Sequence, residues 1–288
     1  MSTSDTVTAV IVTCNSLPSV ISCLKRLDGQ RGLTLHEIVV VDNASTDGSP
    51  DAIRAGHPNV HVVMNKENVG FGRACNQGAE IATGEYLLFL NPDLELDSDA
   101  VGKLLAVARS TGRPGLIAGR LRYADGSFQA NCRRFPTIAN LLFSRGSIMG
   151  RLLMHRSDFR SEMYSLPDYD DVTPVPATAA TMVMIRRDLF NKVRGFDPRF
   201  FLYMEDTDLS LRLHHAGYTN LFVPGAGGVH GFGKGSQIGR FRRSYHHHHS
   251  VWKYFLKHVP NGFSLFLLPL LLAVNLLAGA VMPRPKQR

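Results

Sequence analysis

Two acidic clusters stand where apolar segments of the sequence end. The first, Asn91-Pro92-Asp93, follows the apolar run Tyr86–Leu90, and the second, Glu205-Asp206-Thr207-Asp208, follows an aromatic stretch that begins at Phe200. Carboxylates beside apolar surface are costly unless a cation or a hydrogen-bonding group meets them. Two such clusters, far apart in sequence, could converge on one metal ion and one reacting hydroxyl. This pattern is typical of a transferase that acts on a diphosphate-linked donor.

The first cluster offers one carboxylate for a metal ion. Asp93 could join two diphosphate oxygens around Mg²⁺ or Mn²⁺, because hard cations take oxygen ligands and retain water. The metal would neutralise the charge that builds on a leaving nucleoside diphosphate. The alternative interpretation is an ordinary turn with proline at its second position.

The second cluster offers a proton acceptor. A sugar hydroxyl is a poor nucleophile until a positioned carboxylate takes its proton during attack, and we assign this role to Asp206. Glu205 would bind the acceptor or orient Asp206. Asp208 and Arg212 lie four residues apart on a predicted helix and could pair with each other. Acidic residues at a helix start also interact favourably with the helix dipole, which is the simpler explanation of the cluster.

Three further motifs have both a functional and a structural interpretation. Asp42 follows a predicted strand and could accept a hydrogen bond from a uracil or thymine imide or from a ribose hydroxyl, or could only form a turn. The glycine-rich loop at 68–78 could admit a phosphate, or could only begin a helix. In the segment 230–236, His230 could complete a metal shell and Lys234 could bind diphosphate, although a lone histidine is more often structural.

The elements that would position these residues alternate between strand and helix. Short apolar strands are predicted at 7–13, 37–41, 60–64 and 86–90, and helices at 17–27, 50–56 and 71–82, the first capped by Asn15 or Ser16. Such alternation predicts a parallel sheet covered on both faces, whose ligands bind at the carboxyl ends of the strands. Asn15, Asp42, Asn68 and Asp93 should therefore face one crevice.

The second half of the chain has a weaker pattern. Its predicted elements are helices at 98–110, 188–193 and 209–216, strands at 115–119 and 177–185, and a hairpin turn at 123–127. Gly217 would end the third helix. The segment 144–173 has no clear period and is expected to be a mobile loop that could carry acceptor specificity.

Composition places the chain among foldable globular proteins with anionic partners. Its 288 residues are 44% hydrophobic and 19% charged, with a formal net charge of +8. The basic residues of the last fifth flank an apolar segment rather than an aromatic stacking platform, so nucleic acid is an improbable partner. The polar N-terminus has no secretory signal pattern. The four cysteines have no metal-ligand spacing and look like cytosolic core thiols (Cys14, Cys23, Cys75 and Cys132).

The segment 263–282 carries no charge in 20 residues. About 20 apolar residues can span a bilayer, but Pro269, Asn275 and Gly279 weaken that prediction. The segment could instead lie in the membrane interface, re-enter the membrane, or form a buried C-terminal helix. Basic residues on both sides favour contact with anionic lipid headgroups.

Taken in order, the motifs resemble those of the family 2 glycosyltransferases with the GT-A fold, over residues 7–236. Among these the resemblance is greatest to bacterial rhamnosyltransferases that build lipid-linked cell-surface polysaccharides. The motifs that carry it are at 41–49, 68–78, 91–93, 195–197, 200–208 and 230–236. Three positions depart from the family pattern. The usual Asp-x-Asp is reduced to Asn91-Pro92-Asp93, which makes metal binding more dependent on His230, Ala179-Ala180 replaces Gly-Ala, and Arg194 replaces a common glycine.

The resemblance implies an inverting, metal-dependent, single-displacement transfer from a nucleotide sugar. It implies an α/β GT-A domain at 1–238, with a nucleotide-binding half at 1–97 and an acceptor half at 98–238, followed by a membrane-association segment at 239–288. The implied catalytic pair is Glu205-Asp206, and the implied metal ligands are Asp93 and His230. The implied donor-binding residues are Thr13, Asn15, Asp42, Asn68, Gly70, Asn91, Asp93 and Lys234.

The expected donor is dTDP-L-rhamnose and the expected acceptor is a saccharide on a polyprenyl diphosphate. The enzyme would then work at the cytoplasmic face of the cell membrane, held there peripherally, monotopically or by a single C-terminal span. Two alternatives stay open. One is a transferase of the same fold that uses a UDP-linked hexose or N-acetylglucosamine, and the other is a non-catalytic, membrane-attached protein that kept the fold.

Overall fold

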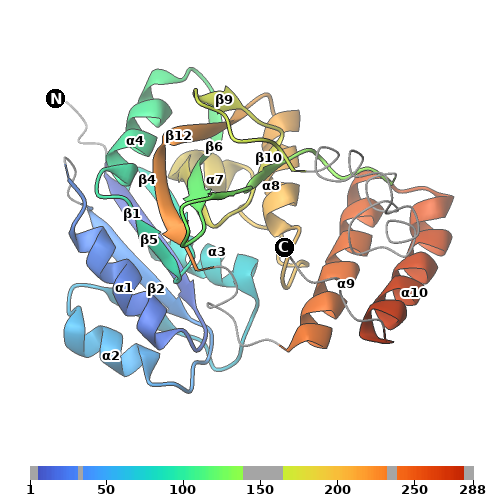
Figure 1. The fold of residues 1–288 in the computed structure, drawn as a ribbon, viewed down its shortest axis with the longest axis horizontal. Coiled ribbons are helices and arrows are strands. Elements are labelled where there is room, and N and C mark those ends of the chain that lie inside the picture. The colour runs from blue at the N-terminus through green and yellow to red at the C-terminus, as the bar shows by residue number, and fades with distance from the viewer. Residues whose placement is uncertain (1–5, 32–34, 139–164, 232–238, 282–288) are drawn as a thin grey trace.

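The computed structural model of the chain describes residues 6–31, 35–138, 165–231 and 239–281. Most of the loop expected at 144–173 lies outside these residues, and so does Lys234. Figure 1 shows a twisted central sheet with helices on both faces and a separate pair of helices at one end. The expected mixed α/β fold is therefore present.

The first half of the chain forms the parallel part of the sheet. Strands β1 (Val7–Thr13), β2 (Glu37–Asp42), β3 (His61–Met64) and β4 (Tyr86–Leu90) run in the order β3-β2-β1-β4, and every neighbouring pair is parallel. They alternate with helices α1 (Leu17–Asp28), α2 (Ser49–Gly56) and α3 (Phe71–Ile81). These seven elements agree with the sequence prediction within about one or two residues.

The second half extends the same sheet with mixed directions. After β4 the order continues β11-β6-β12-β5, with bounds Met182–Arg186, Pro114–Arg122, Thr219–His230 and Leu94–Leu96. Strand β11 is antiparallel to β4 and β6, β12 is parallel to β6, and β5 is antiparallel to β12. Two short strands, β7 (Phe128–Gln129) and β9 (Thr173–Pro174), pair with β6 and β12. The turn between β6 and β7 is the predicted hairpin.

Two sequence predictions in this half are wrong, and one strand was not predicted. The strand expected at 177–185 is two strands, because β10 (Ala177–Thr178) leaves the main sheet to pair with β8 (Cys132–Arg133). Helix α8 (Glu205–His215) begins four residues earlier than expected, so it includes the whole acidic cluster. Strand β12 was not predicted, because Pro224 and three glycines interrupt its apolar pattern; its register shifts between Val223 and Gly227, as at a β-bulge.

The topology brings the candidate residues to one edge of the sheet. Strands β1 to β4 end there, and β12 ends there too, because β6 and β12 run in the same direction as β4. Thr13, Asp42 and His230 are the last residues of their strands, and Asn91 directly follows β4. The sequence predicts that Asn15, Asp42, Asn68 and Asp93 face one crevice, and the strand arrangement places Asp42 and the loop that carries Asp93 at this edge.

The core consists of two apolar layers that the sheet separates. Helices α1, α2 and α4 (Ala100–Ser110) cover one face, and α3, α7 (Arg187–Lys192) and α8 cover the other. Consecutive side chains of β4 alternate between the layers, with Leu88 in the first and Phe89 in the second. Helix α8 is thereby held against the sheet close to the edge where the strands end.

The C-terminal segment forms a helical hairpin beside α8. Helix α9 (Arg240–His258), a five-residue π-helical turn η2 (Phe263–Leu267) and helix α10 (Leu268–Val281) stand next to each other in Figure 1. Tyr254 and Phe255 of α9 pack with Leu268 and Leu272 of α10 in a third apolar cluster. One face of the segment predicted at 263–282 is thus buried and the other is exposed. None of the described helices is both long and apolar enough to cross a membrane.

A close backbone contact joins the loop before α3 to the segment before α8. Gly70 has a φ of +91°, and a Cβ placed on it would lie 2.5 Å from the carbonyl oxygen of Phe201. The neighbouring Phe71 N–H donates to that same oxygen at 3.0 Å. Only glycine combines this φ with this approach, so the contact depends on the residue type at position 70.

We predict that Gly70→Ala lowers the free energy of unfolding by about 2 kcal/mol or more, because a φ of +91° with a ψ of 163° is a conformation open almost only to glycine and the added Cβ would also overpack the contact. Gly126→Ala is the matched control, because Gly126 has a φ of +83° but nothing within 4 Å of its Cβ position. The control should lose only about 1 kcal/mol. Urea unfolding followed by circular dichroism measures both, and equal losses would contradict the contact.

Candidate functional site

Asp42 and Thr13 present two buried oxygen atoms at the ends of neighbouring strands. Asp42 is 1% exposed, and its Oδ2 accepts a hydrogen bond from the Ser45 N–H at 2.9 Å, so the turn interpretation holds for that oxygen. Within the described residues, Asp42 Oδ1 and Thr13 Oγ1 have no hydrogen-bond partner. A buried polar atom left unpaired costs about 1–3 kcal/mol. These two atoms are therefore suited to pair with a ligand such as a nucleoside.

The amides of Asn15 and Asn68 shape the loops around Asp42. Asn15 Oδ1 accepts from the Thr46 N–H at 2.7 Å, and Asn68 Oδ1 accepts from the Gly70 N–H at 3.0 Å. Both side-chain oxygens therefore hold the backbone of a loop. Direct binding of the donor by Asn15 and Asn68 stays a prediction. Ser16 occupies the N-cap position of α1, as one of the two predicted alternatives, but its side chain makes no capping hydrogen bond, and Asp47 Oδ2 instead accepts from the first helical N–H at 2.9 Å.

Asp93 and His230 lie side by side at the same edge. His230 Nε2 is 3.2 Å from Asp93 Oδ1 and 3.3 Å from Asn91 Nδ2, and both Asp93 and His230 are buried. The structure thus brings together the two residues predicted as metal ligands, from positions 137 residues apart. Strand β12 pairs with β5, and His230 lies opposite Leu94 in this pairing. The pairing therefore brings His230 next to Asp93, the residue before Leu94.

The donor set at this position fits a divalent cation. His230 Nδ1 lies 2.7 Å from Gln129 Oε1, so in the tautomer that donates to Gln129, Nε2 presents its lone pair toward Asp93. A second hydrogen bond of this kind commonly orients a metal-binding histidine. No group of three or more His, Cys, Asp or Glu suited to a metal is present among the described residues. A cation here would take two protein ligands, Asp93 and His230, and the rest from phosphate and water.

Asp206 is held in place at the first turn of α8. Its Oδ1 accepts from the Thr207 N–H at 2.6 Å and lies 2.5 Å from Arg133 Nη2. The same guanidinium donates from Nε to Thr207 Oγ1 at 3.1 Å. Arg133 belongs to the short strand β8, which the sequence pattern did not reveal. Its cation fixes the orientation of the predicted base.

Glu205 retains its proton at neutral pH. Complete burial, and then the negative charge of Asp206, raise the pKa of Glu205 to about 8. Its Oε2 has no hydrogen-bond partner in the part of the chain that the structure describes. The side chain lies against Gly72 of α3, where a Cβ would be 3.5 Å from the Cβ of Glu205. The two adjacent carboxyl groups are therefore in different states, with Glu205 protonated and Asp206 paired with a cation.

A short connecting segment places the Asp93 group close to the Asp206 group. Gln129 contacts His230, and Arg133, only four residues later, contacts Asp206. Four residues of fully extended chain reach at most about 14 Å. The two acidic clusters thus lie on the same side of the molecule, as the sequence interpretation requires.

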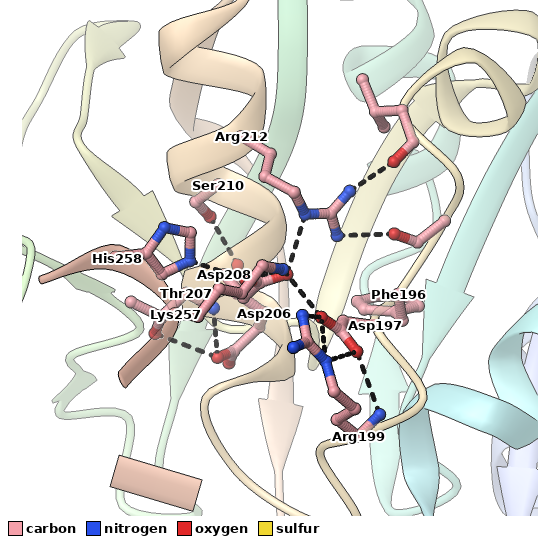
Figure 2. A network of polar contacts seen from close by, with 12 residues as sticks. Phe196, Asp197, Arg199, Asp206, Thr207, Asp208, Ser210, Arg212, Lys257 and His258 are labelled. Atoms are coloured by element: carbon pink, nitrogen blue, oxygen red, sulfur yellow. Dashed lines mark hydrogen bonds and ion pairs between the residues drawn. The ribbon is translucent and has the colours of Figure 1, made fainter. Parts of the chain in front are cut away.

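Asp208 is at the centre of an ion-pair network that the sequence predicted only in part. It is completely buried, and it contacts Arg212 at 2.8 Å, Lys257 at 2.6 Å and His258 at 2.7 Å. The predicted Asp208–Arg212 pair is confirmed, whereas the contacts of Lys257 and His258 from α9 were missed. Figure 2 shows these groups gathered at the first turn of α8, with Asp197 beside them. The network attaches the C-terminal hairpin directly to the helix that carries Asp206.

Comparison with known families identifies this arrangement. The model of Glycosyl transferase family 2 matches residues 8–194, well over half of the chain. The chain belongs to glycosyl transferase family 2. A second model, Glycosyl transferase family group 2, matches residues 153–282 and so includes the C-terminal hairpin. The predicted family is confirmed.

Two curated relatives are rhamnosyltransferases. The N-acetylglucosaminyl-diphospho-decaprenol L-rhamnosyltransferase of Mycobacterium tuberculosis is 30% identical over 207 residues, which cover 67% of this chain and 66% of the relative. A rhamnosyltransferase of Escherichia coli is 27% identical over 150 residues, which cover 52% of this chain and 53% of the relative. The matches thus span just under two thirds and about half of these relatives' lengths.

Solved structures confirm the GT-A fold. A mannosyltransferase from Pyrobaculum calidifontis, solved in complex with GDP-Man and Mn²⁺, superposes with a TM-score of 0.59 at 19% identity, covering 96% of this chain and 76% of that chain. The enzyme GalNAc-T7, solved with UDP, GalNAc and Mn²⁺, gives a TM-score of 0.56 at 20% identity, with coverage of 80% and 44%. At these identities the likeness shows the shared fold.

The raised pKa of Glu205 predicts a specific pH dependence of stability. Because the folded carboxyl binds its proton more tightly than its ordinary pKa of 4.5 would allow, the folded state loses stability relative to the unfolded state as pH rises from about 4.5 to about 8. Glu205→Gln stays neutral and should escape that loss. The stability of the variant relative to wild type should therefore increase between about pH 5 and pH 8.

Urea unfolding at a series of pH values measures this difference. The exposed Glu67→Gln serves as the control and should show no such trend. A wild-type-to-variant difference that stays constant from about pH 5 to pH 8 would contradict a protonated Glu205.

Proposed function

We propose that this protein is an inverting glycosyltransferase that moves L-rhamnose from dTDP-L-rhamnose to a saccharide on a polyprenyl diphosphate. The observation that carries the proposal is the position of Asp206. Arg133 orients this carboxylate at the start of α8. Arg133 lies only four residues after Gln129, which contacts His230 of the Asp93–His230 pair. A proton acceptor and a candidate diphosphate site therefore lie on the same side of the molecule. The rhamnosyltransferase relatives support the sugar and the lipid-linked acceptor.

The residues divide the reaction between two sides of the site. Asp206 takes the proton of the acceptor hydroxyl as its oxygen forms a bond to the anomeric carbon. The bond from that carbon to the donor phosphate oxygen breaks, and the nucleoside diphosphate leaves with the bonding electrons. Attack from the face opposite the diphosphate inverts the anomeric configuration. Asp42 and Thr13 would bind the nucleoside through their unpaired oxygens.

Asp93 and His230 are the residues that would hold Mg²⁺ or Mn²⁺. When bound, the cation supplies positive charge to the oxygens of the leaving diphosphate. Asn91 lies against His230 and would fix the side of the imidazole that faces the ion. Lys234 stays a predicted diphosphate contact, because it lies outside the described residues.

The donor is tested by diphosphate release from a panel of nucleotide sugars. With an N-acetylglucosaminyl diphosphate lipid as acceptor, dTDP-L-rhamnose should release dTDP faster than UDP-glucose, UDP-galactose or UDP-N-acetylglucosamine release UDP. Chelation should stop release, and added Mn²⁺ should restore it. Faster release from a UDP sugar would favour the alternative donor. No release from any donor would favour a non-catalytic protein.

Asp206→Asn should lower kcat by about 10²–10⁴-fold, because the amide cannot accept the hydroxyl proton. Binding of dTDP, measured by calorimetry, should stay near the wild-type value, since the nucleoside side is untouched. Asp51→Asn is the control, because the Asp51 side chain is 91% exposed. A variant at Asp206 that keeps most of its turnover would reject the assignment of the base.

The exposed face of the C-terminal hairpin supports association with a membrane. Phe266, Leu270, Val274 and Leu277 are all exposed and recur at spacings of four, four and three residues, which places them in one stripe along η2 and α10. Arg242 on the adjoining α9 is also exposed. We propose that this stripe enters the interface of an anionic bilayer at the cytoplasmic face of the cell membrane, where a polyprenyl-linked acceptor would reside.

Leu270→Asp should weaken binding to vesicles that contain anionic phospholipid, because a charge replaces a side chain that is 61% exposed on the apolar stripe. Ile81→Asp is the matched control, since Ile81 is 44% exposed at the end of α3. Co-sedimentation with vesicles measures both variants. Equal vesicle binding by the Leu270 variant and wild type would rule out this face as the membrane contact.

A further inference from the structure

The turn that precedes the catalytic pair has an unfavourable backbone conformation. Tyr203 and Met204 have φ values of +68° and +69°, so two consecutive residues with side chains occupy the left-handed region. Glu205 and Asp206 follow directly. Residues persist in this region only when the surrounding structure holds them there, and such conformations are frequent near functional sites.

Helix α9 supplies the contacts that hold this turn. The Ser250 hydroxyl donates to the Leu202 carbonyl oxygen at 2.8 Å. The His246 ring stacks on Phe201 with centroids 4.4 Å apart, and His247 meets Tyr203 edge to face at 5.5 Å. Three consecutive residues of the turn therefore each contact a residue of α9.

Apolar packing adds to these contacts. Phe200 and Met204, at the two ends of the turn, are buried in the apolar cluster formed with α9 and α10. This cluster is separate from the two layers that cover the sheet. Besides the hydrogen bond from the Phe71 N–H to Phe201, the turn is thus packed mainly against the C-terminal hairpin.

The end of α9 holds Asp208, two residues after Asp206. Lys257 Nζ contacts Asp208 Oδ1 at 2.6 Å and also Asp197 Oδ2 at 2.7 Å, and His258 Nε2 contacts Asp208 Oδ1 at 2.7 Å. Figure 2 shows Lys257 and His258 reaching the first turn of α8 beside Asp206. Asp206 is therefore bracketed by two positions, the turn before it and Asp208 after it, that are both fixed by α9.

We propose that the C-terminal hairpin positions the catalytic base, with Ser250 and Lys257 as its positioning residues. Ser250 fixes the turn before Glu205, Lys257 fixes Asp208, and together they set the direction of the Asp206 carboxylate. The proposal rests on the proposed function, because it assumes Asp206 acts as a base. It adds that Ser250 and Lys257 affect the rate of the transfer. Both residues lie on α9, outside the sheet, and neither touches the reacting atoms.

A matched pair of lysine variants tests the role of Lys257. Lys257→Met should lower kcat at least tenfold, since a small displacement of a catalytic group can cost a factor of about 100. Binding of dTDP should stay unchanged. Lys257→Arg keeps the cation and should restore most of the turnover. Lys103→Met is the control, because Lys103 also forms an ion pair with an aspartate, Asp99, but both side chains of that pair are exposed.

Ser250→Ala keeps the ion pairs and tests the turn separately. It removes one hydroxyl that donates to a backbone carbonyl, and it should also lower kcat without changing dTDP binding. Ser110→Ala removes a hydroxyl that bonds a backbone carbonyl on α4, and it should have no effect. A merely structural hairpin would instead give variants with a lower free energy of unfolding and an unchanged kcat per folded molecule.

Hydrogen exchange gives a measurement that does not depend on activity. Amides of residues 201–208 should exchange faster in Lys257→Met and Ser250→Ala than in wild type, while amides of β1 should exchange at the same rate. Failure of wild type with every donor would reject the proposed function, and the exchange data would still decide whether the hairpin holds the turn. Unchanged kcat in both variants, or unchanged exchange at 201–208, would overturn the inference.

Discussion

The need to accommodate buried carboxyl groups at one edge of the sheet constrains much of the rest of the structure. Leaving one member of a buried ion pair alone costs about 3–5 kcal/mol, whereas an exposed pair contributes about 1 kcal/mol or less. Asp208 has no exposed surface, so its cations must be present in the folded state. Asp206 has Arg133, and Glu205 avoids the cost by keeping its proton. Arg133 lies on strand β8 and Lys257 lies on helix α9. These partners therefore require two elements that a simple α/β sheet would not need.

The same constraint explains why the two sides of the site are built differently. On the proposed nucleoside side, parallel strands place Thr13 and Asp42 by topology alone, and loops braced by Asn15 and Asn68 surround them. On the proposed acceptor side, α8 carries its acidic residues directly after a strained turn, and ionic and aromatic contacts from a distant segment hold the turn and the helix start. The first arrangement needs only the sheet, while the second needs the hairpin.

The sequence predicted what local patterns encode and missed what long-range contacts create. The first four strands and three helices follow from apolar runs and turn residues, and the carboxyl-edge rule then placed Asp42 and Asp93 correctly. Strand β12 was missed because glycines and Pro224 break its pattern, although it delivers His230. Gln129, Arg133 and Lys257 act through contacts with residues 49 to 101 positions away in the sequence, and no spacing rule identifies such pairs.

The reduced acidic motif at 91–93 has a structural counterpart in the surroundings of His230. Where a second carboxylate would bring another negative charge, Asn91 brings a neutral amide that lies 3.3 Å from His230 Nε2. Gln129 contacts Nδ1, the other ring nitrogen of His230, so the imidazole is oriented from both sides. Asn91 and His230 together offer less negative charge than a second carboxylate would, so under the proposed function a cation held there would keep more of its positive charge for the leaving diphosphate. The single acid of the motif would then make cation binding depend more on the phosphate oxygens of the nucleotide.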